Sequence, residues 1–93
     1  MVVPWDLKYL QNHGNTVETE LTAIVAWCDG QETDIYEVAT EEDFNNCENL
    51  PEDPVTYSSN GSLDGFIVHG PPVRYFVSKS KCKMGLKVKI VFT

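Results

Sequence analysis

The sequence predicts a single all-β domain, a sandwich or barrel, with one short helix. Three observations support this prediction: short runs rich in β-branched and aromatic residues, turns with glycine or proline between them, and one segment with the features of a helix start. Many short strands separated by turns are typical of sandwiches and barrels. A chain of 93 residues suffices for one domain, so we expect residues 1–93 to fold as a unit.

Five runs have the composition or alternation of strands: 21–27, 33–38, 63–69, 73–77 and 86–92. Glycines, several of them beside asparagine or proline, separate most of these runs. The last run alternates well. Its residues Leu86, Val88 and Ile90 should face the core, because side chains along a strand point alternately to opposite faces.

The expected helix lies near residues 40–48. Thr40 is a residue type that caps helix starts, and the acidic residues Glu41, Glu42 and Asp43 follow it. Carboxylates in a first turn interact favourably with the positive end of the helix dipole. Phe44 should then face the core, and the helix should end before Pro51.

Charge is distributed unevenly along the chain, whose net charge is −7. All fourteen acidic residues lie between Asp6 and Asp64, with Lys8 as the only base in that span, and every later charge is basic. An acidic body repels phosphate, so no nucleic-acid partner is expected. The basic end either balances charge within the fold or forms a patch for an anionic partner.

Other function classes find little support. No apolar run is long enough for a membrane helix, so we expect no membrane span in this chain. We find no catalytic triad in a supporting context, no phosphate-binding loop and no paired carboxylates in an apolar setting. We therefore do not expect an enzyme.

The three cysteines lack the paired short spacings of a zinc site. One disulfide with one cysteine left over fits better, and Cys28, which follows an apolar run, is read as a small buried hydrophobe. A disulfide indicates an oxidising compartment. The sequence Asn60-Gly61-Ser62 is an N-glycosylation sequon, which agrees with a secreted glycoprotein.

Several segments taken together resemble the phytocyanins, the plant blue-copper proteins of the cupredoxin fold, and their copper-free relatives, the early nodulin-like proteins. These segments are ELTAIVAW (20–27), TDIYEV (33–38), DFNNC (43–47), YFVS (75–78) and CKMGLKV (82–88). The resemblance implies a Greek-key β-sandwich of the cupredoxin type. It also implies a disulfide between Cys47 and Cys82, with Cys28 free.

The same resemblance identifies the positions of the copper ligands. A blue copper site uses two histidine nitrogens, a cysteine thiolate and a weak axial ligand. At the corresponding positions this chain has Thr33, Ser78, Lys81 and Leu86. None of the four suits blue copper, so we expect no cofactor.

We therefore expect a copper-free extracellular recognition module, and we expect it to be a monomer. It would be secreted or lie at the extracellular face of the plasma membrane, and the resemblance allows a lipid anchor on the precursor. The expected partner is an extracellular protein or an acidic glycan. The candidate surface is Lys79, Lys81, Lys83 and Met84, with the lysines of the last strand expected on the same basic face. The alternative is a copper-binding electron-transfer protein with an atypical site.

Overall fold

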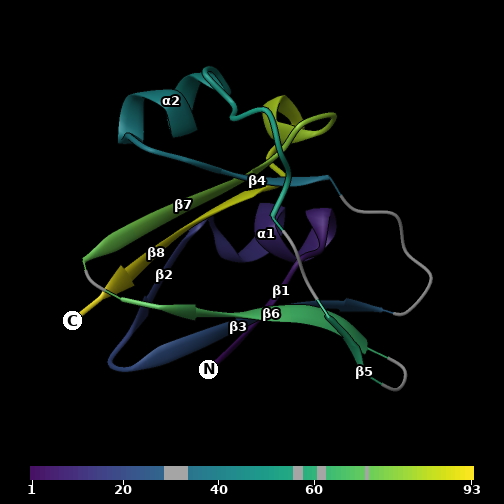
Figure 1. The fold of residues 1–93 in the computed structure, drawn as a ribbon, viewed down its shortest axis with the longest axis vertical. Coiled ribbons are helices and arrows are strands. Elements are labelled where there is room, and N and C mark those ends of the chain that lie inside the picture. The colour runs from purple at the N-terminus through teal and green to yellow at the C-terminus, as the bar shows by residue number, and fades with distance from the viewer. Residues whose placement is uncertain (29–33, 56–57, 61–62, 71) are drawn as a thin grey trace.

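The computed structural model describes residues 1–28, 34–55, 58–60, 63–70 and 72–93 (Figure 1). Its strands form two four-stranded sheets that face each other. The first sheet has the order β1 (Val2–Pro4), β3 (Thr22–Cys28), β6 (Leu63–His69), β5 (Ser58–Asn60). The second has the order β2 (Thr16–Thr19), β8 (Lys87–Phe92), β7 (Val73–Ser78), β4 (Ile35–Val38).

Both sheets combine antiparallel and parallel pairs. The longest pairing is antiparallel, between β3 and β6, and runs from Thr22 opposite His69 to Cys28 opposite Leu63. The pairs β4–β7 and β7–β8 are also antiparallel, whereas β1 and β2 run parallel to β3 and β8. The predicted alternation of the last strand is confirmed, because Leu86, Val88 and Ile90 are all buried.

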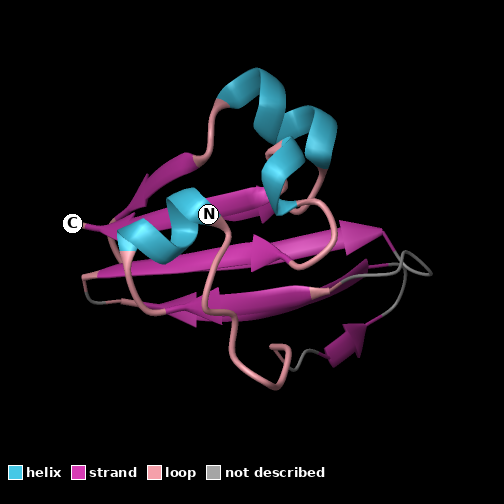
Figure 2. Cartoon of the chain, turned by 90° about the horizontal axis from the view of Figure 1, so that it is seen from above, coloured by secondary structure: helices cyan, strands magenta, loops and turns pink. Residues whose placement is uncertain are grey.

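The hydrophobic core lies between the two sheets. Its largest fully buried side chains include Trp5, Leu10 and Phe76, packed with valines and isoleucines from both sheets. A smaller cluster of Val38, Phe44, Val77 and Cys82 lies beneath the helix that follows β4. The strands form the body of the molecule and the helical segments lie around them (Figure 2).

The predicted helix is α2 (Glu41–Asn46). The Thr40 hydroxyl accepts a hydrogen bond from the Asp43 backbone N–H at 3.1 Å, and Phe44 is buried, both as expected. Cys47 ends the helix in a left-handed conformation, with φ 56°. Within the described residues no helix is long and apolar enough to cross a membrane.

A second helix, α1 (Leu7–His13), was not predicted. Asp6 caps it by accepting a hydrogen bond from the Tyr9 backbone N–H at 3.1 Å, and Leu10 buries its side chain completely. Seven residues with so few buried positions give almost no helical periodicity, which explains why the sequence pattern did not indicate it. A 3-10 turn, η1 (Cys82–Met84), lies between β7 and β8.

Candidate functional site: the loop between β7 and β8

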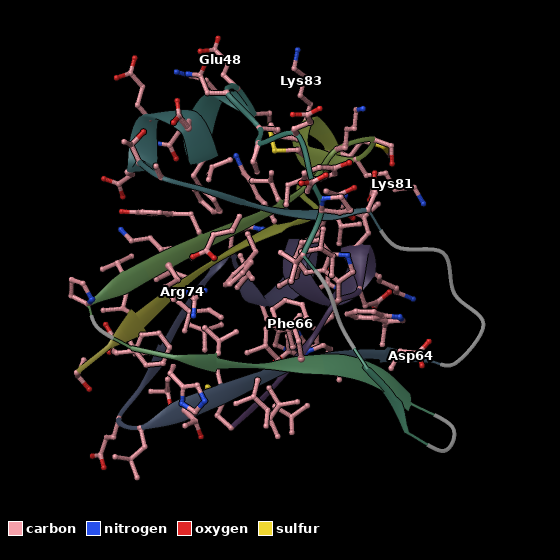
Figure 3. All side chains as sticks on the ribbon, viewed as in Figure 1. Glu48, Asp64, Phe66, Arg74, Lys81 and Lys83 are labelled. Atoms are coloured by element: carbon pink, nitrogen blue, oxygen red, sulfur yellow. A yellow bond between two sulfur atoms is a disulfide. The ribbon has the colours of Figure 1, made fainter. Side chains whose placement is uncertain are left out.

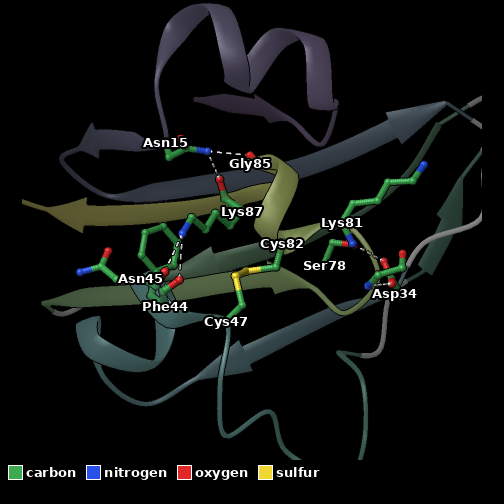
Figure 4. Close-up of a disulfide and its surroundings, with 11 residues drawn as sticks. Asn15, Asp34, Phe44, Asn45, Cys47, Ser78, Lys81, Cys82, Gly85 and Lys87 are labelled. Atoms are coloured by element: carbon green, nitrogen blue, oxygen red, sulfur yellow. Dashed lines mark hydrogen bonds between the residues drawn. A yellow bond between two sulfur atoms is a disulfide. The ribbon is translucent and has the colours of Figure 1, made fainter.

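The candidate site is the loop of residues 79–86, which we call the β7–β8 loop. A disulfide between Cys82 and Cys47 connects this loop to the end of α2 (Figure 4). The pairing implied by the resemblance is thus confirmed. The side chain of Cys28 lies outside the described part of the structure, so its free thiol stays a prediction.

Asp34 holds the first half of the loop. Its Oδ1 accepts a hydrogen bond from the Ser78 hydroxyl at 2.7 Å, and its Oδ2 accepts one from the Ser80 backbone N–H at 2.6 Å. Its backbone carbonyl accepts a third, from the Lys79 N–H at 3.1 Å. The Ser78 hydroxyl in turn accepts from the Lys81 N–H at 3.0 Å (Figure 4). One aspartate therefore fixes the backbone of three successive loop residues, directly or through Ser78.

The electrostatics of Asp34 follow from these contacts. Burial raises the pKa of this carboxyl, but the hydrogen bonds from Ser78 and Ser80 together outweigh burial and hold its pKa below the usual 3.8. Asp34 is therefore ionised at neutral pH. An ionised acceptor makes stronger hydrogen bonds than a neutral one, so the charge of Asp34 strengthens its bonds to Ser78 and Ser80.

The second half of the loop is held from α1 and the residue that precedes β2. The Asn15 side-chain amide donates to the Gly85 carbonyl at 2.8 Å and to the Lys87 carbonyl at 2.6 Å. The Gln11 amide donates to the Met84 carbonyl at 3.0 Å. Gly85 has φ 110°, a conformation that favours glycine, where the loop turns into β8. The backbone of the loop is thus fixed from several sides.

The exposed side chains on this fixed backbone are basic. Lys79, Lys81 and Lys83 are all exposed, and Met84 is 58% exposed. Lys81 and Lys83 point away from the body of the protein in different directions (Figure 3). In the part of the chain that the structure describes, none of the three ammonium groups makes a hydrogen bond or an ion pair. The loop therefore displays three positive charges that the fold does not use.

The lysines of β8 behave differently. Lys87 and Lys89 share one side of the strand as expected, but both contact α2. The Lys87 ammonium donates to the Phe44 carbonyl at 3.1 Å and lies 4.9 Å from the centre of the Phe44 ring. Lys89 pairs with Glu41 at 2.6 Å. Lys87 and Lys89 are thus engaged by α2 and do not add to the exposed basic surface of the loop.

Arg74 is also paired, because its guanidinium contacts both carboxylate oxygens of Glu37, at 2.7 and 2.8 Å. Hydrogen bonding to Glu37 raises the pKa of Arg74 above its usual value. Charge balance within the fold, one of the two interpretations of the basic segment, thus holds for Arg74 and Lys89. Only the loop lysines remain candidates for the other interpretation, a patch that binds an anionic partner.

The residues at the implied copper positions do not fit blue copper. Ser78 is fully buried and offers a hydroxyl, not a thiolate, and that hydroxyl already bonds to Asp34 and Lys81. Lys81 contributes an exposed cation, and Leu86 a buried hydrocarbon. Thr33 lies outside the described residues. Within the described ranges, no group of three or more His, Cys, Asp or Glu side chains is placed to hold a metal ion.

The histidines do not supply the missing ligands. His13 stacks on Tyr9 with ring centres 4.2 Å apart, and its Nδ1 lies 3.0 Å from the Tyr9 carbonyl. His69 is exposed on β6, in the other sheet from Ser78. The side chain of Asn60 and the whole of Gly61 and Ser62 lie outside the residues that the structure describes. Glycosylation at Asn60 therefore stays a prediction.

Sequence reasoning missed the residues that position the loop. Asp34, Asn15 and Gln11 lie 44 to 73 positions from their partners along the chain. Polar residues beside strands are common in loops, and nothing in their local pattern indicates such distant partners. From the sequence, Asp34 was included only as part of segment 33–38, which resembles the phytocyanins, and was given no role of its own.

The two sheets and the disulfide-linked loop form a β-sandwich, and the likeness to a solved structure shows that it is of the cupredoxin type. Among solved structures, the chain is similar to stellacyanin from cucumber, a phytocyanin whose structure was determined with Cu²⁺ at pH 7.0. The TM-score is 0.52 and the identity 19%, over 76% of this chain and 67% of that chain. A likeness at this identity concerns the fold. No protein-family model and no curated protein matches the chain.

Proposed function

We propose that this chain is a phytocyanin-like recognition module of the copper-free, early nodulin-like type. In this proposal it acts outside the cell, secreted or at the extracellular face of the plasma membrane. It binds a glycan or a protein through the surface of Lys79, Lys81, Lys83 and Met84. It acts by binding and not by electron transfer.

The observation that carries the proposal is the contrast between the inside and the outside of the β7–β8 loop. Inside, the Ser78 hydroxyl and the loop backbone are used in hydrogen bonds to Asp34 and its neighbours. Outside, three lysines are exposed and unpaired among the described residues. A fixed backbone lowers the entropy lost when a partner binds, and clustered charge of one sign speeds the encounter with an opposite charge.

Two features support an extracellular location. The Cys47–Cys82 disulfide is of the kind that persists in oxidising compartments. The sequon at Asn60 adds an acceptor sequence for glycosylation on the secretory route.

The test is a binding screen of the folded domain against glycans and extracellular proteins, followed by charge reversal of the loop. The variant Lys79→Glu/Lys81→Glu/Lys83→Glu should lose most of the affinity, and wild-type affinity should fall as salt is added. Lys8→Glu, on α1, is the control, because it reverses the charge of a lysine outside the loop. Its affinity should be closer to that of the wild type. Unchanged affinity in the triple variant would remove the loop from the function.

The alternative, a copper-binding electron-transfer protein with an atypical site, takes its support from the Cu²⁺ named for cucumber stellacyanin. Copper–thiolate chemistry needs a thiolate at the position of Ser78, and the hydroxyl there is bonded inside the protein. The geometry therefore favours the binding module.

A further inference from the structure

We infer that the partner of the β7–β8 loop is a linear acidic polysaccharide, one whose carboxylates are separated by neutral sugar hydroxyls, as in a uronic acid polymer. This inference rests on the proposed function and narrows its ligand to one chemical class. It follows from the shape of the loop, from the residue types that it displays and from the charges beside it.

The shape of the site suits an extended ligand. Lys81 and Lys83 leave the same loop in different directions, so their ammonium groups do not converge on one point (Figure 3). A small anion is held best by several donors that converge on it. Much of the loop backbone is already occupied, because Ser80, Lys81, Met84 and Gly85 all use backbone groups in internal hydrogen bonds. A ligand therefore contacts mainly the side chains of the loop.

The residue types on the loop favour a polysaccharide over a protein. Protein interfaces take most of their binding energy from tryptophan, tyrosine and arginine, and lysine is depleted in them. Residues 79–86 contain none of those three types and offer lysines, one exposed methionine and the exposed Ser80. Lysine is a mobile point charge that tolerates varied carboxylate geometry. A serine hydroxyl both donates and accepts, which matches sugar hydroxyls.

The neighbouring charges limit how densely charged the ligand can be. Glu48 follows α2 and lies at the same end of the molecule as Lys83 (Figure 3). Glu42 and Asp43 on α2 add further negative charge there, and the whole chain carries −7. A polyanion with more than one charge per sugar, such as heparin, would be repelled more strongly by these carboxylates than a polymer with one carboxylate per sugar. A chain with carboxylates spaced by neutral groups can contact the lysines with less repulsion.

The experiment is calorimetric titration of the folded protein with galacturonate oligomers of increasing length at low salt. Affinity should rise with length, because a longer chain engages several lysines at once, and the single sugar should show no measurable binding. Neutral dextran, heparin and polyglutamate are the comparison ligands, and each should bind at least several-fold more weakly than the longest oligomer. Heparin represents dense sulfate and polyglutamate an acidic protein segment.

Two variants of equal net charge separate position from overall charge. Lys81→Gln and Leu21→Glu each make the protein more negative by one charge, and Leu21 is 80% exposed at the turn between β2 and β3. Lys81→Gln should weaken oligomer binding about threefold, and Leu21→Glu should change it less. The triple Lys→Gln variant at 79, 81 and 83 should lose about tenfold or more.

Each outcome has a defined meaning. Tighter binding of polyglutamate would overturn the polysaccharide, and tighter binding of heparin would overturn the polymer with one carboxylate per sugar. In either case, loss of that binding in the triple variant would leave the proposed function standing. If the triple variant binds the oligomers as well as the wild type does, both the inference and the proposed function of the loop are overturned. Binding that does not depend on oligomer length would contradict the extended contact. Length-dependent binding that Lys81→Gln weakens and Leu21→Glu does not would support the inference.

Discussion

Asp34 shows how much of the loop geometry can depend on one residue. Its carboxylate and carbonyl accept hydrogen bonds from Ser78, Ser80 and Lys79, which are distant from it along the chain. Hydrogen bonds to an ionised carboxylate are stronger than those between neutral groups. Without Asp34, the Ser78 hydroxyl would have no acceptor for its proton. Its oxygen would then no longer be oriented to accept the hydrogen bond from the Lys81 N–H.

The variant Asp34→Asn should be less stable at pH 7 by about 1 kcal/mol, a modest value because the carboxylate is partly exposed. The folded pKa of Asp34 lies below 3.8, so its contribution is present above pH 3.8 and is lost as pH falls through the folded pKa. Urea unfolding of both proteins at pH 7 and in acid measures this. A stability difference that does not shrink in acid would show that the charge of Asp34 is not what matters.

At the scale of elements, β8 and α2 are held together by the two lysines of the strand. Lys89 contacts Glu41 in the first turn of α2, and Lys87 contacts the carbonyls of Phe44 and Asn45 near its end. A helix of six residues is not stable alone, so tertiary contacts must hold it. A cation at a helix C-terminus also interacts favourably with the helix dipole.

Replacing Lys87 with methionine should therefore destabilise the fold by about 1 kcal/mol, through loss of the carbonyl contacts and the contact with the Phe44 ring. The matched variant Lys81→Met removes an exposed lysine from the loop and should change stability by less than about 0.5 kcal/mol. Chemical denaturation compares the two directly. Equal losses in both variants would contradict the division into structural and free lysines.

The disulfide connects the β7–β8 loop to the end of α2 covalently. It joins residues 35 positions apart, and the loop-entropy model gives a contribution of about 3–4 kcal/mol for a closed loop of that length. The variant Cys47→Ala/Cys82→Ala should be less stable by that order, and the β7–β8 loop should exchange its amide hydrogens faster. Hydrogen exchange and urea unfolding measure both effects. A variant as stable as the wild type would mean that Asp34, Asn15 and Gln11 hold the loop without the bridge.

At the scale of the whole molecule, the parts predicted from sequence were those with a local pattern. The runs that became β3, β4, β6, β7 and β8 show apolar composition or alternation, and α2 has a capping residue followed by acids. The elements β1, β2 and β5 are only three or four residues long and form by pairing with distant strands. Their existence depends on tertiary partners, which no local pattern contains.

The candidate site was predicted only in part, because some of its residues have a local sequence pattern and others depend on contacts made in the fold. The loop lysines and Met84 could be named from sequence, and they are exposed as a binding surface requires. Alternation also placed Lys87 and Lys89 on one side of β8, but it could not show that α2 covers that side. The contacts from Asp34, Asn15 and Gln11 depend on the fold and had no signal in the sequence.

At the end of this cupredoxin-type fold where the resemblance places copper, the described residues form a hydrogen-bonded loop whose side chains do not suit blue copper. The most direct measurement is copper titration of the folded wild-type protein, followed by calorimetry and visible absorption. We predict no tight site and no intense copper–thiolate absorption, because the Ser78 hydroxyl is bonded to Asp34 and cannot act as a thiolate. Tight binding of one copper ion with the intense blue absorption of a copper–thiolate bond would show that the protein has a blue copper site after all.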